Sequence, residues 1–282
     1  MTSISNKIGR ISLILPFITV FFLFQIMPFL EVLKMSFFDE IKEEFSFTNY
    51  LYVFNSKLDI KAISASLSLS LWSTLWGLLI AFITAFSITK LKTSKIKNAL
   101  IAFTTMSNNF SGVPLAFAFI IILGTNGALT LLLKEIGFET FNIKSAAGIL
   151  MIYIYFQIPL GILLLLPAIN SLKPEWREAN DLLGGSNFSY WRTIAIPILT
   201  KPLIGTAIIL FANAIGAYAT LYALSGSNFL VVPTRISSLI NGNVFYDPHS
   251  ASALAIILMI ILFFISSIHY LFFKRVPSKG KS

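Results

Sequence analysis

Long stretches without lysine, arginine, aspartate or glutamate alternate along the chain with short charged segments. These stretches are residues 11–30, 62–89, 98–133, 145–172, 202–234 and 248–273. Each can hold one helix of about 20 residues, the length that crosses the hydrocarbon core of a bilayer. A single strand would leave its backbone groups unpaired in lipid, so each span is expected to be helical. We therefore predict an all-α integral membrane protein with six transmembrane helices at about 11–30, 64–89, 98–123, 146–170, 202–224 and 251–273.

The third stretch contains a polar interruption. Residues 107–114 read Ser-Asn-Asn-Phe-Ser-Gly-Val-Pro, and glycine and proline both interrupt helices. Backbone groups freed at membrane depth are tolerated only against protein or a water-filled cavity. We therefore expect the third span to be broken or bent here. We also expect Asn108, Asn109 and Ser111 to be candidates for lining a path across the membrane.

Three further polar side chains are candidates for the same path. They are Gln157 in the fourth span and Asn213 and Tyr218 in the fifth. Because polar side chains in spans also form hydrogen bonds between helices, Gln157 and Asn213 fit either interpretation. The six stretches contain no charged residue, whereas ionisable groups within spans usually mark ion pathways and proton relays. This pattern argues against a transporter driven by an ion gradient.

Composition excludes a soluble enzyme. The 282 residues are 56% hydrophobic and only 12% charged, against about 25% charged residues in ordinary soluble domains. The chain has no cysteine, and its two histidines, His249 and His269, are far apart. Disulfides and thiolate chemistry are therefore excluded, and we expect neither a metal site nor a catalytic residue.

Positive charge is concentrated in alternate loops. Two thirds of the 21 Lys and Arg residues lie in the N-terminal segment, the 90–97 loop, the 173–201 loop and the C-terminal tail. The positive-inside rule then places both termini in the cytoplasm. This arrangement accounts for the net charge of +9 without a nucleic-acid partner. No second soluble domain is recognisable, so residues 1–282 are expected to form a single transmembrane domain.

The 171–201 loop is the longest of the positively charged loops. Pro174 suits a first helical turn, Gly184 and Gly185 would end that helix, and Ser186 can cap a second helix that runs to about Ile196. Aromatic side chains lie among its charges at Trp176, Phe188, Tyr190 and Trp191. Such a surface is typical of a docking site for another protein, and equally of a loop that lies on lipid headgroups.

A resemblance to a known family lies in the spacing of residues in this loop. The EAA motif reads E-A-A, three residues, G, nine residues and I-x-L-P, and the chain matches every spacing with Glu178, Ala179, Asn180, Gly184, Ile194, Ile196 and Pro197. Asn180 stands where the motif has alanine, and Ile196 where it has leucine. The chain thus resembles the permease subunits of binding-protein-dependent type I ABC importers, over about residues 10–275.

The resemblance implies a multi-pass permease of the bacterial cell (inner) membrane with the loop 171–201 as its coupling loop. Glu178 would be the charged contact with a cytoplasmic ABC ATPase dimer, Ala179 would permit close approach, and Gly184 would form the turn. The ATPase would bind ATP and magnesium, so this chain would carry no cofactor and hydrolyse nothing. The other implied partners are the lipid bilayer, a second and different permease subunit, and an extracytoplasmic binding protein.

Weaker similarities point to one branch of these permeases. Phe47-Thr48-Asn49-Tyr50, Gly124-Thr125-Asn126-Gly127 and residues 239–253 are similar to permeases for the polyamines spermidine and putrescine, with relatives for 2-aminoethylphosphonate, ferric iron and thiamine. An amine-bearing small solute is therefore expected, with ferric iron or thiamine as the alternative. Two other classes stay open. A secondary transporter would move solute without an ATPase, and a membrane scaffold would bind partners without moving solute.

Overall fold

The computed structural model describes residues 14–39, 44–137, 142–241 and 246–274, and for 268–274 the backbone alone. Within these ranges, six helices are long and apolar enough to cross a membrane: Ile14–Ser36, Lys57–Lys90, Val113–Glu135, Ala146–Asn170, Asn187–Ile215 and Pro248–Ser267. The prediction of an all-α protein with six spans is confirmed. The charged residues expected at the two ends (Lys7, Arg10, Arg275, Lys279 and Lys281) and the side chain of His269 lie outside the described residues.

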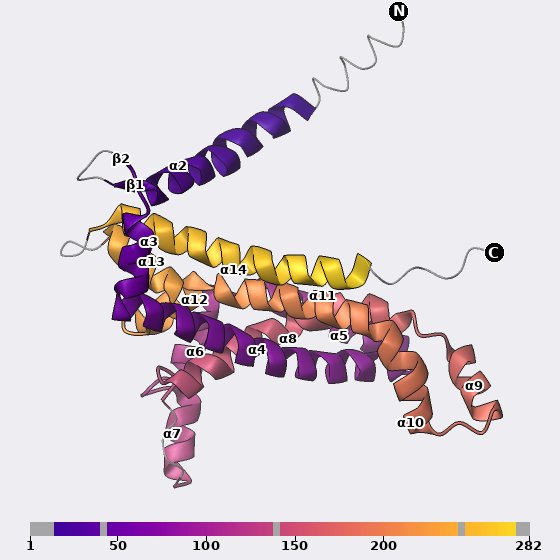
Figure 1. The fold of residues 1–282 in the computed structure, drawn as a ribbon. Helices are drawn as coiled ribbons and strands as arrows, with labels where there is room; N and C mark the ends of the chain where they lie inside the picture. Colours follow the sequence, from indigo (N-terminus) through magenta and orange to yellow (C-terminus); the bar gives the residue numbers. More distant parts are fainter. Residues whose placement is uncertain (1–13, 40–43, 138–141, 242–245, 275–282) are drawn as a thin grey trace, which may run out of the picture. The chain divides into compact units, whose positions relative to one another are not determined.

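Helices make up almost all of the regular structure (Figure 1). In chain order the elements are η1 (Phe22–Ile26), α2 (Met27–Ser36), β1 (Phe38–Asp39), β2 (Glu44–Phe45), α3 (Thr48–Asn55), α4 (Lys57–Lys90), α5 (Ser94–Asn109), α6 (Val113–Leu123), α7 (Ala128–Glu135), α8 (Ala146–Asn170), α9 (Pro174–Leu182), α10 (Asn187–Tyr190), η2 (Trp191–Ala195), α11 (Ile196–Ile215), α12 (Tyr218–Ser225), α13 (Val232–Asn241) and α14 (Pro248–Lys274). The elements η1 and η2 are π-helical stretches within longer helices.

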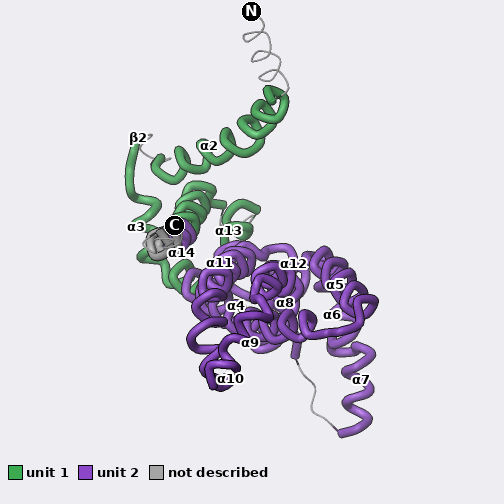
Figure 2. Tube along the Cα trace, turned by 90° about the vertical axis from the view of Figure 1, so that its right-hand side faces the viewer, with its two compact units in different colours: residues 1–62, 235–260 green, residues 63–234, 261–282 purple. Residues whose placement is uncertain are grey.

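The chain divides into two compact units (Figure 2). Unit 1 comprises residues 1–62 and 235–260, and unit 2 comprises residues 63–234 and 261–282. In unit 1 the amide of Asn49 on α3 donates hydrogen bonds to the carbonyls of Met35, Ser36 and Phe38. These bonds tie α3 to the end of α2 and to the antiparallel hairpin of β1 and β2, in which Phe38 is paired with Phe45.

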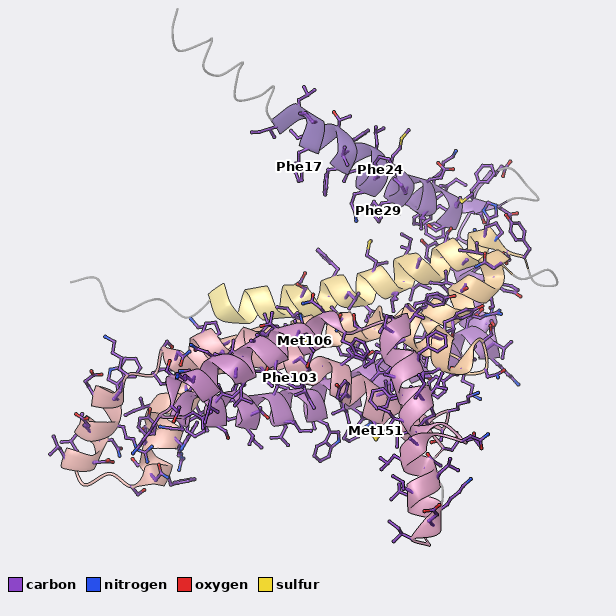
Figure 3. All side chains as sticks on the ribbon, turned by 180° about the vertical axis from the view of Figure 1, so that it is seen from behind. Phe17, Phe24, Phe29, Phe103, Met106 and Met151 are labelled. Atoms are coloured by element: carbon purple, nitrogen blue, oxygen red, sulfur yellow. The ribbon has the colours of Figure 1, made fainter. Side chains whose placement is uncertain are left out.

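The first span presents apolar side chains on its surface. Phe17, Phe24 and Phe29 are all exposed (Figure 3), and within the 18-residue window that identifies this span none of the residues is buried. A helix that is apolar on every side is stable in a bilayer, where hydrocarbon covers it. The exposed phenylalanines therefore fit the predicted membrane setting.

The centre of unit 2 is the packing of α8 against its neighbours. It contacts α5 and α11, and its residues Ile162 and Leu165 form a buried cluster with Ala81 and Ala85 of α4. A Cβ added at Gly161 would lie 2.7 Å from the Cβ of Ala81. Small residues at such contacts let helix backbones approach closely, which drives helix association in membranes.

The third span is broken where the sequence predicts. Helix α5 ends at Asn109 and α6 begins at Val113, so the break falls inside the predicted segment 107–114. Gly112 has a φ of +70°, a conformation that glycine adopts without strain. The predicted span 98–123 takes in α5, the break and α6, whereas the long apolar helix of the structure begins only at Val113.

The fifth span differs from the predicted range 202–224. The helix runs from Asn187 to Ile215 and therefore includes the second helix of the loop, which we predicted to end near Ile196. A proline inside a helix normally removes a hydrogen bond. Here Pro197 lies in the first turn of α11, directly after η2, where the N–H of Ile196 bonds to the carbonyl of Trp191. The wider π-turn thus accommodates the proline, and the span breaks instead at Gly216 and Ala217.

Candidate functional site

The loop between α8 and α11, which contains α9, α10 and η2, carries its apolar side chains on the outside. We call residues 171–197 the α9–α10 loop, which thus includes the first two residues of α11. Leu182 is 89% exposed, Leu183 is 88% exposed and Phe188 is 72% exposed. Figure 1 shows α9 and α10 projecting from the end of the helices of unit 2. Leu182 and Leu183 lie outside the spans, and Phe188 lies in the first turn of the helix that continues into the fifth span. A cluster of exposed large apolar side chains marks a surface for a partner protein or a membrane.

The turn between α9 and α10 is held by one side chain. The amide of Asn180 donates hydrogen bonds to the carbonyls of Gly185 (3.1 Å) and Ser186 (3.4 Å), and the N–H of Gly185 donates to the carbonyl of Asn180 (2.8 Å). Asn180 is only 8% exposed. A Cβ added at Gly185 would lie 2.3 Å from Oδ1 of Asn180. The asparagine and the glycine therefore fit together, and Asn180 faces the inside of the loop.

Two different faces of the loop carry the residues of the EAA-like motif. Ala179, Asn180, Ile194 and Pro197 line one apolar groove of about 550 Å³, together with Trp176 and Leu183. Glu178 lines a separate cavity beside the ends of α4 and α8. Gly184 lies at the turn with a φ of +75°, and Ile196 is exposed at the start of α11.

The two breaks in the spans have protein partners for their carbonyl groups. The hydroxyl of Thr220 on α12 donates to the carbonyl of Gly112 (3.2 Å), and the hydroxyl of Tyr153 on α8 donates to the carbonyl of Ala217 (2.8 Å). Non-helical backbone at membrane depth needs such partners. The break in the third span and the break in the fifth are thus connected through α12.

The predicted path residues occupy different surroundings. Asn108 is half-buried and Ser111 is exposed, while the amide of Asn109 donates back to the carbonyl of Thr105. Asn213 is exposed on α11, and the ring of Tyr218 stacks on Tyr222.

Gln157 is fully buried. Its amide donates to the hydroxyl of Ser73 on α4 (2.7 Å). Its Oε1 and the hydroxyl of Thr74 are buried without a hydrogen-bond partner among the described residues. In this conformation Gln157 therefore forms a hydrogen bond between helices, which was the alternative to a place in the path.

Unit 1 contains an ion pair that could not be predicted from the sequence. Asp59 in the first turn of α4 accepts a hydrogen bond from Nε of Arg235 on α13, and the two side chains are 0% and 11% exposed. Oδ2 of Asp59 is buried without a partner among the described residues. The two residues are 176 positions apart, so spacing could not pair them. The only signal was the position of each charge at the edge of an apolar stretch.

Comparisons with known proteins point to transport permeases. No protein-family model matches the chain. The thiamine transport system permease protein ThiP of Escherichia coli is 27% identical over 146 residues, which is 51% of this chain and 27% of that protein. The putative ferric transport system permease protein FbpB 1 of Haemophilus influenzae is 29% identical over 167 residues, 57% of this chain and 26% of that protein.

A probable sulfate transport system permease protein, cysT of Zygnema circumcarinatum, is 29% identical over 134 residues, which is 46% of each chain. The matched part of the chain thus spans about a quarter to a half of the length of these curated relatives. These relatives are all named as permease proteins of transport systems.

Solved structures agree over nearly the whole chain. A bacterial ABC transporter involved in the import of the acidic polysaccharide alginate has a chain that is 20% identical, with a TM-score of 0.78 over 98% of this chain and 99% of that chain. The methionine ABC transporter MetNI, in inward-facing conformations, has a chain that is 13% identical, with a TM-score of 0.59 over 77% of this chain and 95% of that chain. This chain therefore has the type I ABC importer permease fold, and its sequence relatives are transport-system permease proteins.

Proposed function

We propose that the chain is the membrane-spanning permease subunit of an ATP-driven importer for a small solute. The α9–α10 loop is the observation that carries this proposal. It exposes Leu182 and Leu183 between the fourth and fifth spans and Phe188 in the first turn of the helix Asn187–Ile215, and the EAA-like spacing of Glu178 to Pro197 lies in the same loop. A cytoplasmic ATPase dimer would cover these side chains, and exposed aromatic and apolar anchors are what such interfaces bury.

The continuous helix behind the loop supplies a physical route for the motion. No break separates α10, η2 and α11 between Asn187 and Ile215. Because the hydrogen bonds of Asn180 hold α9 to the turn before α10, a displacement of the loop by the ATPase would move α11 as a rod. The displacement would reach the break at Gly216 and Ala217, beside the break of the third span. In this proposal the chain supplies the moving parts and the ATPase binds and hydrolyses ATP.

The proposed complex has further members outside this chain. A second permease subunit, different from this one, would complete the path, and an extracytoplasmic binding protein would deliver the solute. Both termini would lie in the cytoplasm, as the charge distribution predicts. One solved neighbour of this fold, the alginate transporter, is in complex with a periplasmic protein that carries an alginate pentasaccharide. That arrangement supports the proposed role of a binding protein.

The path would pass the break in the third span, where Asn108, Asn109 and Ser111 lie. Of these, Asn109 is exposed and bonds only to its own helix in the contacts described above. Replacing Asn109 by Leu would remove the polar amide and leave the packing between helices intact. We expect Asn109→Leu to lower uptake while the chain still assembles with its ATPase. Unchanged uptake would exclude Asn109 from the path.

Amine-bearing solutes, such as spermidine, putrescine or 2-aminoethylphosphonate, are the proposed cargo. This narrower proposal rests on the similarity of residues 47–50, 124–127 and 239–253 to that branch of permeases. Thiamine and ferric iron are the alternative, and the names of two relatives mention them. Calorimetric titration of the cognate binding protein with these solutes distinguishes amine-bearing cargo from thiamine or ferric iron. Micromolar or tighter binding of a polyamine or 2-aminoethylphosphonate is expected, and binding of thiamine or ferric iron alone would replace the narrower proposal.

Co-purification tests the permease proposal directly. The full chain, the variant Glu178→Arg and the control variant Glu175→Arg would be isolated from membranes and probed for a bound ATPase. Both glutamates are exposed on α9, but only Glu178 belongs to the motif. We expect the wild type and Glu175→Arg to retain the ATPase and Glu178→Arg to lose it. If a folded wild-type chain carries no ATPase, and if it takes up solute in response to an ion gradient, a secondary transporter replaces the proposal. If it moves no solute at all, a scaffold does.

A further inference from the structure

A cavity of about 400 Å³ lies at the base of the α9–α10 loop. Its walls come from three elements that end close together: the last turn of α4, the end of α8 with the residues that follow it, and one face of α9. The EAA-like motif contributes only Glu178 to these walls. The cavity is therefore distinct from the apolar groove that holds Ala179, Ile194 and Pro197.

Charged side chains of both signs line this cavity. The positive ones are Lys90, Lys173 and Arg177, and the negative ones are Glu178 and Asp181. Within the described ranges, none of the five forms an ion pair with another residue. Lys90, Lys173, Glu178 and Asp181 are exposed and Arg177 is half-buried, so their charges are accessible from solvent. Charges of both signs around one cavity match a ligand that itself carries a negative and a positive group.

The two signs are separated along α9. Pro174, Arg177, Glu178 and Asp181 are spaced three, one and three residues apart, so they lie on one helix face. Lys173 precedes this face, and Asp181 follows about 12 Å further along the axis at 1.5 Å per residue. Lys90 ends α4, which contacts the cavity at the end where α8 finishes. The cavity is thus positive next to the membrane helices and negative toward the far end of α9.

Two positive side chains are held in place by neighbours that leave their charge available. The guanidinium of Arg177 lies over the ring of Tyr190 (5.8 Å) and donates to Oδ1 of Asn187 (3.2 Å). The ammonium of Lys90 lies over the ring of Phe86 (5.2 Å). Neither contact neutralises the cation, because an aromatic ring and an amide oxygen carry no net charge. Both cations are therefore positioned and ready to bind an anion.

Two apolar side chains of the membrane helices also line the cavity. Phe86 of α4 and Ile169 of α8 line it, and both helices are candidate spans. Lysine and arginine at the ends of spans lie at the level of the lipid headgroups. A ligand that fits this cavity therefore has an apolar part on the side of the spans, a phosphate next to Lys90 and Lys173, and a cationic group toward Asp181.

From this layout we propose that the cavity binds the phosphoethanolamine headgroup of a membrane phospholipid. The phosphate would accept hydrogen bonds from Lys90, Lys173 and Arg177, and the primary ammonium would donate hydrogen bonds to Glu178 and Asp181. An acyl chain would follow Phe86 and Ile169. A choline headgroup cannot donate these bonds, because its nitrogen carries three methyl groups. A glycerol headgroup has no cation to satisfy the two carboxylates.

This proposal needs the membrane-spanning arrangement but does not need an ATPase or a particular solute. It goes beyond the permease proposal because it assigns a lipid to a cavity to which the motif contributes only Glu178. Lipid binding is measured on the full chain purified without partners, whereas the permease proposal is tested by ATPase retention. Failure of one measurement therefore leaves the result of the other unaffected.

Native mass spectrometry of the full chain with phosphatidylethanolamine, phosphatidylcholine and phosphatidylglycerol of identical acyl chains provides the test. We expect phosphatidylethanolamine to bind about tenfold more tightly than the other two, as charge-assisted hydrogen bonds would give. Equal binding of the three lipids, or preference for phosphatidylglycerol, would overturn the proposal. Soluble phosphoethanolamine is the probe for the headgroup alone. If it binds as tightly as the lipid, the site takes a soluble zwitterion and the lipid assignment is wrong.

Single-charge variants locate the site. Lys90→Gln and Lys173→Gln should each weaken phosphatidylethanolamine binding about fivefold, the effect expected for one cation at the headgroup level. Lys92→Gln is the matched control, because Lys92 is exposed two residues after Lys90 and does not line the cavity. An equal loss with Lys92→Gln would show a general effect of surface charge and overturn the proposal.

A variant at the acidic end of the cavity tests the role of the carboxylates. Asp181→Asn keeps the size of the side chain and removes one carboxylate charge. We expect it to lower phosphatidylethanolamine binding and to leave phosphatidylglycerol binding unchanged or stronger, so that the preference between the two lipids falls. An unchanged preference would remove the carboxylates from the site and with them the argument for a zwitterionic headgroup.

Discussion

The buried face of α4 and the α9–α10 loop differ in which side chains they expose: α4 buries polar side chains, and the loop exposes apolar ones. Along α4, Asp59, Ser66 and Ser73 are all buried. In the loop, Leu182 and Leu183 are almost fully exposed. In a bilayer the lipid side of a helix is already apolar, so polar side chains gain most by bonding to a neighbouring helix. Outside the spans, exposed leucines are removed from water when a partner protein covers them, which is favourable.

The same two regions also use glycine differently. Gly161 brings α8 close to Ala81 of α4, where an added Cβ would collide. Gly184 and Gly185 shape the turn of the loop, where one adopts a positive φ and the other makes room for Asn180. Substitutions in the first region should therefore change the stability of the helix bundle. Substitutions in the second should change function and leave the bundle folded.

The largest expected effect concerns the buried charge of α4. Asp59→Asn leaves the guanidinium of Arg235 buried without its counter-charge, which typically costs about 3–5 kcal/mol of unfolding free energy. Denaturant titration in detergent measures the loss. The double variant Asp59→Leu with Arg235→Met removes both charges and should recover most of the stability. A single variant as stable as the wild type would mean that the pair is not buried in solution.

The next effect tests the close contact of α8 with α4. Gly161→Leu forces a large side chain against Ala81 and should cost about 1–3 kcal/mol, the usual cost of overpacking. The midpoint of thermal unfolding in detergent measures it. Gly216→Ala is the control, because its Cβ would meet only the carbonyl of Ala212 at an ordinary 3.5 Å. Equal midpoints for the two variants would contradict the close packing.

A smaller effect on stability, but a clear one on function, is expected in the loop. The Cβ in Gly185→Ala would collide with Oδ1 of Asn180 and displace the turn. If the chain is a permease as proposed, uptake should fall while the thermal midpoint stays unchanged. Adding Asn180→Ala removes the obstructing amide, so the double variant should transport better than Gly185→Ala alone. If the second substitution gives no recovery, Asn180 does not hold the turn in the way the contacts indicate.

The smallest effect concerns the hydrogen bond between Gln157 and Ser73. Hydrogen bonds between membrane helices average only about 0.6 kcal/mol. The variant Gln157→Leu also removes an Oε1 that is buried without a described partner. We therefore expect the unfolding free energy to change by less than about 1 kcal/mol. A large loss of uptake at unchanged stability would instead place Gln157 in the path of the solute.

The sequence predicts what depends on local rules. Proline and glycine locate the break before Val113 and the turn at Gly184. Hydropathy gives the number of spans, although the third and fifth helices have other bounds than predicted. What it misses depends on partners that are distant in the chain. The pairing of Asp59 with Arg235 joins residues 176 positions apart, and the burial of Gln157 depends on which face of α4 it meets.

The role of Asn180 could not be predicted from the sequence, although the residue lies within a recognised motif. A departure from alanine to asparagine looks neutral in a motif, because the motif describes contacts with a partner. In the fold, the asparagine amide bonds to Gly185 and Ser186 in its own loop. The second glycine of the pair was the available signal, since a turn needs only Gly184 for its positive φ. The π-turn before Pro197 left no comparable signal in the sequence.

The hydrogen bond from Thr220 to the carbonyl of Gly112 has a mechanical consequence. It joins α12 to the start of α6, and these two helices also pack together. Each is the short part that follows the interruption of a span, with its own glycine at the interruption. Because the two half-helices share this hydrogen bond and pack together, they form one packed unit beside the ends of α5 and α11. A displacement of one half-helix would therefore be passed directly to the other, so the interruptions of the third and fifth spans are coupled.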